Sequence, residues 1–439
     1  MITISDNNYT GKVCHRNDVT DLLYIANKPI KRLCEENEQL LVFPLSIDES
    51  DDRIGDSTVV DIYTEEEDTV RLKSGNIMGF VGRKNQQLKI FSRFDDDKND
   101  YFLHYMLQKV FSYNIFNLDF TSSEENIFDF LHFMFPAFLK RAMKQGIYKE
   151  YRRFQHNDSD VRGTIDVSRH IRENIPFRGT ISYNTRDFSY DNSVTELIHH
   201  TIEYIRTTQQ GEIILSSDKT VEGCVKDIVA HTPSYRHSAR MKVIQENLSP
   251  RIHPFYTEYA NLQKLCIQIL RQEEIKYGAD DNRIYGMLFD GAWLWEEYLN
   301  TILQGVGFKH PENKLGTGAI YLFEHGGKRF PDFWKKDFVL DAKYKKLASD
   351  DNRLGINRDD IHQVMAYMYR LRAQKGGIVY PFNGRNNQFV SEKMHKDSYL
   401  GFMSSYGLAI PKNCESYADF VGCISKNENA FIESLLYIL

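Results

Sequence analysis

Short runs in which hydrophobic and polar residues alternate dominate the chain between residues 59 and 94. Four of them, VVDIYTEE, TVRLKSGN, IMGFVGR and QLKIFSRF, are separated by turn-forming residues. A period of two is typical of strands that bury one face. We therefore expect a small β-barrel or sandwich up to about residue 95. A short helix that runs into a strand is expected before it, over residues 31–44.

The middle of the chain changes to longer apolar stretches with helical spacing. The expected helices are 100–111, 125–146 (with Pro136 inside it), 193–208 and most of 212–280, and the expected strands are 162–171 (RGTIDVSRHI) and 180–191 (TISYNTRDFSYD). A basic stretch runs from Lys140 to Arg162. This region is therefore predicted to mix helices and strands.

After residue 280 the order of expected elements is helix, three strands, helix, strand. The elements are a helix over 286–307, strands within 319–326, 328–334 and 338–347, a helix over 358–377 closed by Gly-Gly, and a strand over 376–382. A chain of 439 residues is long enough for about three domains. We expect a multidomain α+β or α/β protein with a β-rich domain (1–120), a connecting domain (121–280) and an α/β domain (281–439).

Charge is distributed unevenly along the chain. Residues 1–120 hold 14 of the 55 Lys and Arg and 21 of the 61 Asp and Glu, so their net charge is −7, and the remainder carries +1. Contact with nucleic acid is therefore expected after residue 120 rather than before it. No apolar run is long enough to span a bilayer, and no signal peptide is visible, so we expect a cytoplasmic protein without a membrane association.

Several kinds of site are excluded by missing motifs. The six cysteines form no C-x-x-C pair, which argues against structural zinc. The sequence contains no G-x-x-x-x-G-K-[ST], so the chain lacks a P-loop, and it contains no G-x-S-x-G nucleophile elbow. Any NTP-driven motor would have to be a separate protein.

One constellation after residue 280 carries chemistry. Pro331-Asp332 is followed nine residues later by Asp341-Ala342-Lys343, which matches P-D…[DE]-x-K. Residues i and i+2 of a strand share a face, so Asp341 and Lys343 are expected to point the same way. A hairpin would bring Asp332 beside Asp341. The alternative is an ordinary ion pair on an exposed sheet face.

Two carboxylates beside a lysine suit the hydrolysis of a phosphodiester. A divalent cation polarises the phosphate and lowers the pKa of the attacking water. Mg²⁺ needs one or two carboxylates and keeps several waters, and Mn²⁺ is a possible substitute. Asp332 and Asp341 are therefore the predicted metal ligands, and Lys343 is predicted to orient the water and offset charge.

Flanking residues extend the predicted site. Glu296, in LWEEYL, could reach the metal, with Glu297 as the competing choice. Gln363 and Tyr367 form Q-x-x-x-Y, and their i, i+4 spacing places them on one helix face as supporting residues. Alternatively, these residues only solvate or pack their helices. The candidate DNA-binding residues are Lys335, Lys336, Lys345, Arg152 and Arg153.

These residues resemble the PD-(D/E)xK nuclease superfamily and, within it, the McrC family of McrBC modification-dependent restriction systems. The resemblance lies in LWEEYL, FPDF, VLDAKYK and D-x-x-Q-x-x-x-Y (360–367), and more loosely in residues 161–171 and 182–202. It covers roughly residues 150–385. The expected fold of residues 281–439 is accordingly a PD-(D/E)xK restriction-endonuclease-like α/β core.

The resemblance implies a Mg²⁺-dependent endonuclease subunit that cleaves modified double-stranded DNA. It also implies a partner, a McrB-like AAA+ GTPase hexamer, which recognises methylcytosine and whose hydrolysis is stimulated by docking of the N-terminal part. Two alternatives stay open: a stand-alone or repair-type nuclease of the same superfamily, and a non-catalytic regulator of an AAA+ ring. The sequence does not show the recognised modification, the docking residues, the partner's nucleotide preference or the oligomeric state.

Overall fold

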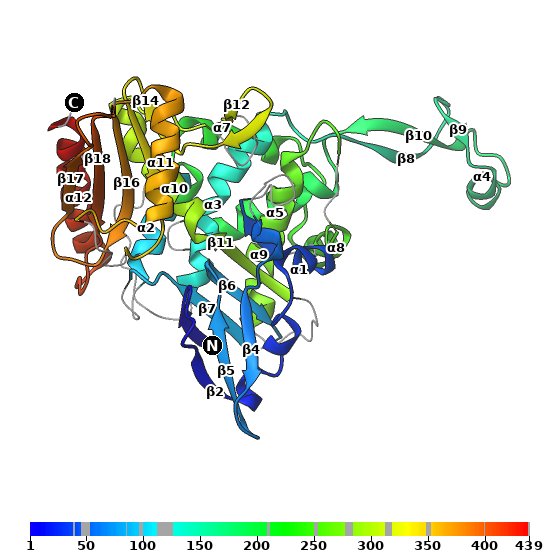
Figure 1. The fold of residues 1–439 in the computed structure, drawn as a ribbon. Helices are drawn as coiled ribbons and strands as arrows, with labels where there is room; N and C mark the ends of the chain where they lie inside the picture. Colours follow the sequence, from blue (N-terminus) through cyan, green and yellow to red (C-terminus); the bar gives the residue numbers. More distant parts are fainter. Residues whose placement is uncertain are drawn as a thin grey trace. The chain divides into compact units, whose positions relative to one another are not determined.

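The computed structural model describes residues 1–37, 40–44, 53–84, 86–95, 100–111, 126–208, 211–249, 253–276, 284–311, 318–347, 353–398 and 400–437. The chain divides into two compact units. The first unit combines Met1–Ile127 with Glu274–Leu439, and the second is Phe128–Glu273. Figure 1 shows the elements of both. Within the described residues, no helix combines the length and the apolar character needed to cross a membrane.

The first unit holds most of the strands. They are β1 (Ile2–Ser5), β2 (Lys12–His15), β3 (Leu40–Phe43), β4 (Val60–Thr64), β5 (Thr69–Ser74), β6 (Ile77–Arg83), β7 (Gln86–Phe91), β11 (Ile284–Asp290), β12 (Ile320–Phe323), β13 (Gly326–Arg329), β14 (Phe333–Lys335), β15 (Phe338–Ala342), β16 (Lys375–Phe382), β17 (Gln388–Lys393) and β18 (Phe402–Ala409). Its helices are η1 (Arg16–Val19), η2 (Leu22–Tyr24), α1 (Ile30–Glu36), η3 (Arg53–Asp56), α2 (Tyr101–Phe111), α10 (Gly291–Leu303), η5 (Gln304–Val306), α11 (Arg358–Leu371) and α12 (Tyr417–Tyr437).

The alternating runs near the N-terminus form strands as predicted. They are β4 to β7, and β5 alternates regularly between buried and half-buried residues. A three-stranded sheet (β2-β5-β4) and a five-stranded sheet (β1-β7-β6-β11-β3) share one hydrophobic core, to which Ile4, Leu72 and Leu88 belong. The N-terminal region is therefore sandwich-like, with parallel pairs at β1–β7 and β3–β11.

β11 corrects the prediction of one helix over residues 286–307. Residues 284–290 are a strand between β6 and β3, and the helix α10 starts only at Gly291. Asp290 ends the strand and caps the helix, because its carboxylate accepts a hydrogen bond from the amide of Trp293 at 2.7 Å. Residues on both sides of position 280 thus share one sheet. The predicted domain boundaries at residues 120 and 280 stay a prediction.

The second large sheet of this unit has the order β14-β15-β16-β18-β17. Its three central strands are parallel, and β14 and β17 pair antiparallel to their neighbours. α11 connects β15 to β16 and packs on both of them through Val364, Tyr367 and Met368. The helix ends at Leu371, before the predicted Gly-Gly stop. Gly376 and Gly377 instead lie in β16, where a Cβ on Gly376 would lie 2.3 Å from Met368 Sδ.

The second unit is mainly helical and carries one long hairpin (Figure 1). Its elements are α3 (Asn126–Met143), β8 (Glu150–Asp158), β9 (Thr164–Ile165), α4 (Val167–Glu173), β10 (Ile181–Ser189), α5 (Ser193–Arg206), α6 (Gly211–Leu215), α7 (Lys219–Ala230), η4 (His237–Ala239), α8 (Arg240–Glu246) and α9 (Glu258–Lys276). The predicted strand 162–171 is mostly the helix α4, because Asp166 caps it by accepting from the amide of Arg169.

Candidate active site

The predicted hairpin of the P-D…D-x-K segment is confirmed. Asp332 directly precedes β14, which pairs antiparallel with β15, and β15 carries Asp341. A carboxylate oxygen of Asp332 (Oδ2) accepts a hydrogen bond from the amide of Ala342 at 2.7 Å. The intervening turn holds Lys336 at a φ of 21°. The hairpin therefore places the two aspartates side by side at the carboxyl end of β15.

Lys343 and the Q-x-x-x-Y residues complete a continuous network. Lys343 Nζ lies 2.7 Å from Asp341 Oδ2 and donates to Gln363 Oε1 at 3.0 Å. The Gln363 amide donates to the Tyr367 hydroxyl at 2.7 Å. That hydroxyl donates at 3.2 Å to the carbonyl of Phe330, just before the Pro-Asp pair. α11 thus links the lysine to the strand that positions Asp332.

The alternative of an exposed surface ion pair does not fit this geometry. Asp341 is 1% exposed and Asp332 is 9% exposed, so both carboxylates are taken out of bulk water. Burying two like charges is costly unless they are neutralised. Burial, followed by the charge of Asp341, raises the pKa of Asp332 to about 7. Burial also raises the pKa of Asp341, although Lys343 opposes this shift.

These pKa shifts predict a pH dependence of stability in EDTA. A folded-state pKa near 7, against an ordinary value of 3.8, means that folding favours the protonated form of Asp332. The associated stability is present at low pH and is lost as the pH rises from about 4 to about 7. We expect Asp332→Asn to flatten this fall in melting temperature between pH 5 and pH 8. Asp359→Asn, at an exposed position on α11, should leave the slope unchanged. An unchanged slope in Asp332→Asn would contradict the assignment.

The two glutamates of LWEEYL have different surroundings. Glu297 lies 3.5 Å from His310 Nε2, and His310 Nδ1 donates to the backbone carbonyl of Asp332 at 2.8 Å. Burial lowers the pKa of His310, but the Glu297 carboxylate and the Asp332 carbonyl outweigh it and raise that pKa. Glu296 is half-buried on α10. His310 is a site neighbour that no motif in the sequence identified.

The described residues contain no group of three or more His, Cys, Asp or Glu side chains that could hold a metal ion. The role of Glu296 as a further acidic group near the metal stays a prediction. Two carboxylates remain. A hard cation that retains water or binds substrate oxygens accepts such a set, because Mg²⁺ is commonly held by one or two carboxylates.

The candidate DNA-binding lysines of the first unit differ in their contacts. Lys335 donates to the carbonyl of Val306 at 3.2 Å, and Lys345 lies 2.5 Å from Asp360. Both ammonium groups therefore have partners within the protein. Lys336 is exposed in the β14–β15 turn. All three roles stay predictions, and Lys336 has the position best suited to an external phosphate.

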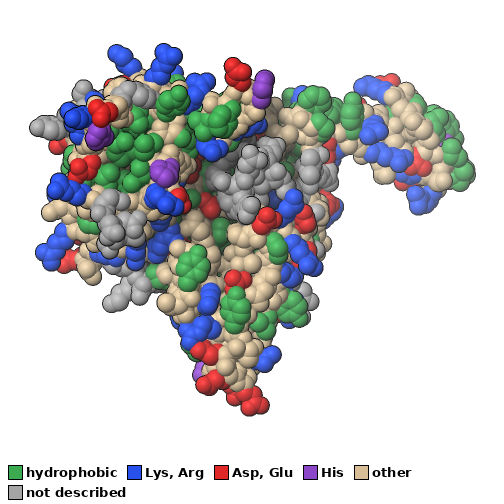
Figure 2. Space-filling view, viewed as in Figure 1, with side chains coloured by type: hydrophobic (Ala, Val, Ile, Leu, Met, Phe, Trp, Pro, Cys, Tyr) green, Lys and Arg blue, Asp and Glu red, His purple; other side chains and the backbone are tan. Residues whose placement is uncertain are grey.

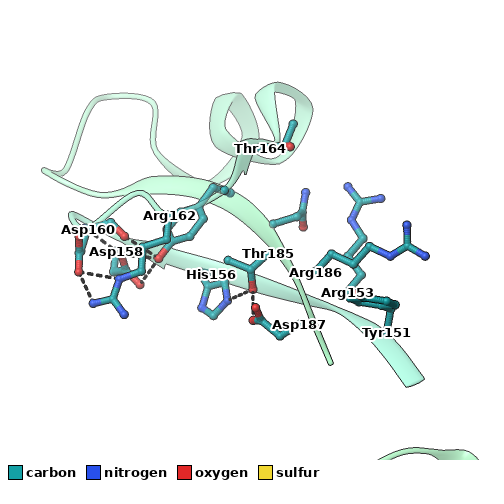
Figure 3. A pocket seen from close by; sticks show the side chains of 13 residues that line it. Tyr151, Arg153, His156, Asp158, Asp160, Arg162, Thr164, Thr185, Arg186 and Asp187 are labelled. Atoms are coloured by element: carbon teal, nitrogen blue, oxygen red, sulfur yellow. Dashed lines mark hydrogen bonds and ion pairs between the residues drawn. The ribbon is translucent and has the colours of Figure 1, made fainter. Parts of the chain in front are cut away.

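The two candidate arginines lie on the hairpin of the second unit. Arg152 donates to the carbonyl of Asp191 and lies 3.8 Å from Glu196, so it ties the base of the hairpin to α5. Arg153 is exposed and pairs across the strands with Arg186, beside Tyr151 (Figure 3). Tyr151, Arg153 and Arg186 line part of a concavity of about 1010 Å³ on this hairpin, and Figure 2 shows Lys and Arg side chains exposed along it. Contact with DNA stays a prediction, and only Arg153 of the two is well exposed.

Comparison with known proteins assigns the chain to a family. A family model described as McrBC 5-methylcytosine restriction system component matches residues 72–381. The chain belongs to the McrBC family. The match spans most of the chain and includes all six predicted catalytic and supporting residues. The resemblance inferred from the sequence motifs is thereby confirmed at the level of the McrBC family.

Two solved structures of McrBC complexes contain chains that are similar to this one. One is a refined half-complex from the tetradecameric assembly of Thermococcus gammatolerans McrB AAA+ hexamers with bound McrC; it matches with 17% identity, 100% coverage of both chains and a TM-score of 0.50. The cryo-EM structure of the Thermococcus gammatolerans McrBC complex matches with 15% identity over 69% of this chain and 87% of that one, at a TM-score of 0.32. The first likeness supports a common fold. No curated protein matches the chain.

Proposed function

We propose that the chain is the Mg²⁺-dependent DNA endonuclease subunit of an McrBC-like restriction complex. The observation that carries this proposal is the buried pair Asp332 and Asp341 beside Lys343, in a chain of the McrBC family. The sheet that holds them, β14-β15-β16-β18-β17 with α11 on it, is proposed to be a PD-(D/E)xK nuclease core. A purely regulatory chain would have no need to keep two carboxylates buried at such cost.

The residues present fit a divalent cation. Asp332 and Asp341 would hold Mg²⁺, or Mn²⁺ in its place, because their raised pKa values mark carboxylates whose charge is poorly compensated within the chain. When bound, the cation would polarise the phosphate and acidify a water. No third protein ligand is required, since Mg²⁺ retains waters and takes oxygens from the substrate.

The other residues of the network have proposed roles that follow from their contacts. Lys343 would orient the attacking water and offset charge on the phosphate, since its ammonium group lies between Asp341 and Gln363. Gln363 would fix the direction of that ammonium group. Tyr367 would fix Gln363 and, through the carbonyl of Phe330, the segment that carries Asp332 into β14.

A McrB-like AAA+ GTPase hexamer is the proposed partner, and modified double-stranded DNA is the proposed substrate. Membership in the McrBC family and the fold shared with a chain from an McrB–McrC assembly support the partner. Docking through the acidic residues 1–120, with stimulation of GTP hydrolysis, is also proposed. Their net charge of −7 repels the DNA backbone, so a protein is the better match for that region.

A cleavage assay tests the proposed function. We expect methylated plasmid to be cut only when the chain, the AAA+ protein of the same system, GTP and Mg²⁺ are all present, and EDTA to stop the reaction. Mn²⁺ should restore it. Cutting by the chain alone with Mg²⁺ would favour a stand-alone nuclease instead. Stimulated GTP hydrolysis without any cleavage, under every metal condition, would favour a regulator.

A further inference from the structure

Tyr344, the residue after Lys343, is buried against loops of the N-terminal sandwich. Its hydroxyl lies 2.7 Å from Ser92 Oγ, and its ring packs edge-on against Phe94 at 5.1 Å between centroids. Both partners follow β7, far from Tyr344 in the sequence but within the same compact unit. The chain that leaves β15 after the predicted catalytic lysine is therefore fixed by the N-terminal region.

Arg93 makes the most extensive contact with this residue. Its guanidinium donates to the backbone carbonyl of Tyr344 and lies 4.6 Å from the centre of the Tyr344 ring. The same group donates to Asn76 Oδ1 at 3.1 Å and lies 3.3 Å from Asp6 Oδ2. Only 11% of the Arg93 side chain is exposed. The Arg93 guanidinium group thus joins three loops of the sandwich to the segment that carries Lys343.

The start of α10 also packs against the Tyr344 ring. A Cβ on Gly291 would lie 2.8 Å from the ring, so glycine at the first position of α10 allows this close approach. The amide of Gly291 donates to the carbonyl of Asn76 at 2.9 Å, which binds the helix start to the same loops. Tyr344 is therefore enclosed on several sides. A shift of its backbone would displace Lys343, its immediate neighbour.

We propose that Arg93 and Tyr344 are positioning residues for Lys343, so that the N-terminal sandwich completes the cleavage site. The inference rests on the proposed nuclease function. The Lys343 amide already donates to the carbonyl of Val379 at 2.9 Å, which fixes the residue on its sheet side. Arg93 holds the carbonyl of Tyr344, the next residue along the chain. Together these two hydrogen bonds fix the backbone from which the Lys343 side chain extends.

The test uses Arg93→Lys in the complete system with partner, GTP and Mg²⁺. Lysine keeps a positive charge beside Asp6 but cannot reach Asp6, Asn76 and the Tyr344 carbonyl at once. We expect kcat for DNA cleavage to fall by about 10- to 100-fold, as for a misplaced catalytic group. DNA affinity, KM and stimulated GTP hydrolysis should stay unchanged.

Arg83→Lys is the matched control. Arg83 is also a largely buried arginine of the sandwich, 2.7 Å from Asp21 and stacked 3.7 Å from the centre of the Tyr24 ring. The Arg83→Lys protein should lose a similar amount of stability but keep the wild-type kcat. An equal fall of kcat in both variants would show a general effect of loosening the sandwich and overturn the proposal.

A double-mutant cycle separates this proposal from the proposed function. If Arg93 acts through Lys343, adding Arg93→Lys to Lys343→Ala causes no further loss of cleavage. Multiplicative losses, or wild-type cleavage by Arg93→Lys, would overturn the positioning role alone. Wild-type cleavage by Lys343→Ala would overturn the proposed function instead. Should Arg93→Lys fail to fold, Tyr344→Phe, which loses the hydroxyl's contacts with Ser92 Oγ and Met78 Sδ but keeps the ring, enters the same cycle.

Discussion

Asp341→Ala is expected to lower the rate of DNA cleavage by about a thousandfold or more while the protein stays folded. Metal-assisted stabilisation of phosphodiester hydrolysis is worth several kcal/mol, and about 4 kcal/mol corresponds to a thousandfold in rate. Asp341 is proposed to hold the metal and lies 2.7 Å from Lys343. Substitution by alanine removes both the metal ligand and the ion pair with Lys343.

The Asp341→Ala protein is expected to stay folded because a second carboxylate, that of Asp332, can offset the charge of Lys343. Removing one partner of a buried ion pair usually leaves an uncompensated charge. Here Asp332 remains close enough to interact with Lys343 electrostatically. The variant also no longer buries two like charges. We expect a melting temperature within a few degrees of the wild type.

The measurement is cleavage of methylated DNA with partner, GTP and Mg²⁺ supplied, alongside thermal unfolding and partner binding. Asp359→Ala is the control, since Asp359 lies on α11 with its side chain 89% exposed. Partner binding and stimulated GTP hydrolysis should be retained in both variants. Full cleavage by Asp341→Ala would refute the assignment of the site.

Gly79→Ala is expected to destabilise the first unit by about 3 kcal/mol or more, at the upper end of the usual range for single substitutions. Gly79 has a φ of +122°, which L-residues rarely adopt, and a Cβ there would lie 2.2 Å from the carbonyl oxygen of Met287. That oxygen belongs to β11, so relief of the clash requires β6 and β11 to separate. The sheet would lose hydrogen bonds as well as packing.

Gly326→Ala separates backbone strain from the clash. Gly326, in the same unit, has a φ of +119°, and no atom lies within 4 Å of a Cβ built on it. Strain alone should cost about 1–2 kcal/mol. Urea unfolding of both variants measures the difference. Equal losses of unfolding free energy would show that contact between β6 and β11 contributes nothing to the effect.

Local pattern predicted much of the fold because it depends on neighbours in sequence. Alternation marked β4 to β7, and the spacing of Asp332, Asp341 and Lys343 predicted a hairpin that the structure contains. The i, i+4 spacing placed Gln363 and Tyr367 on one helix face, and their hydrogen bond follows from it. In each case the geometry is fixed within about ten residues.

Features that depend on residues far away in the sequence were missed, because a local pattern does not show which distant residues will pack together. The segment IYGMLFD (284–290) suits a buried helix as well as a buried strand, and pairing with β3 and β6 selects the strand. Arg93 lies in an ordinary S-R-F sequence, and only the folded chain brings it to Tyr344. Glu297 lies beside His310, which likewise reaches the site only through the fold.

The place of β11 in the first sheet also constrains biosynthesis. β6 and β3 both pair with β11, yet a ribosome completes β6 at Arg83 and reaches the end of β11 only at Asp290. Until then the growing chain exposes two unpaired strand edges, which are prone to pair with other chains. The whole second unit is synthesised during that interval. A gene fragment ending before residue 284 would make those exposed edges permanent.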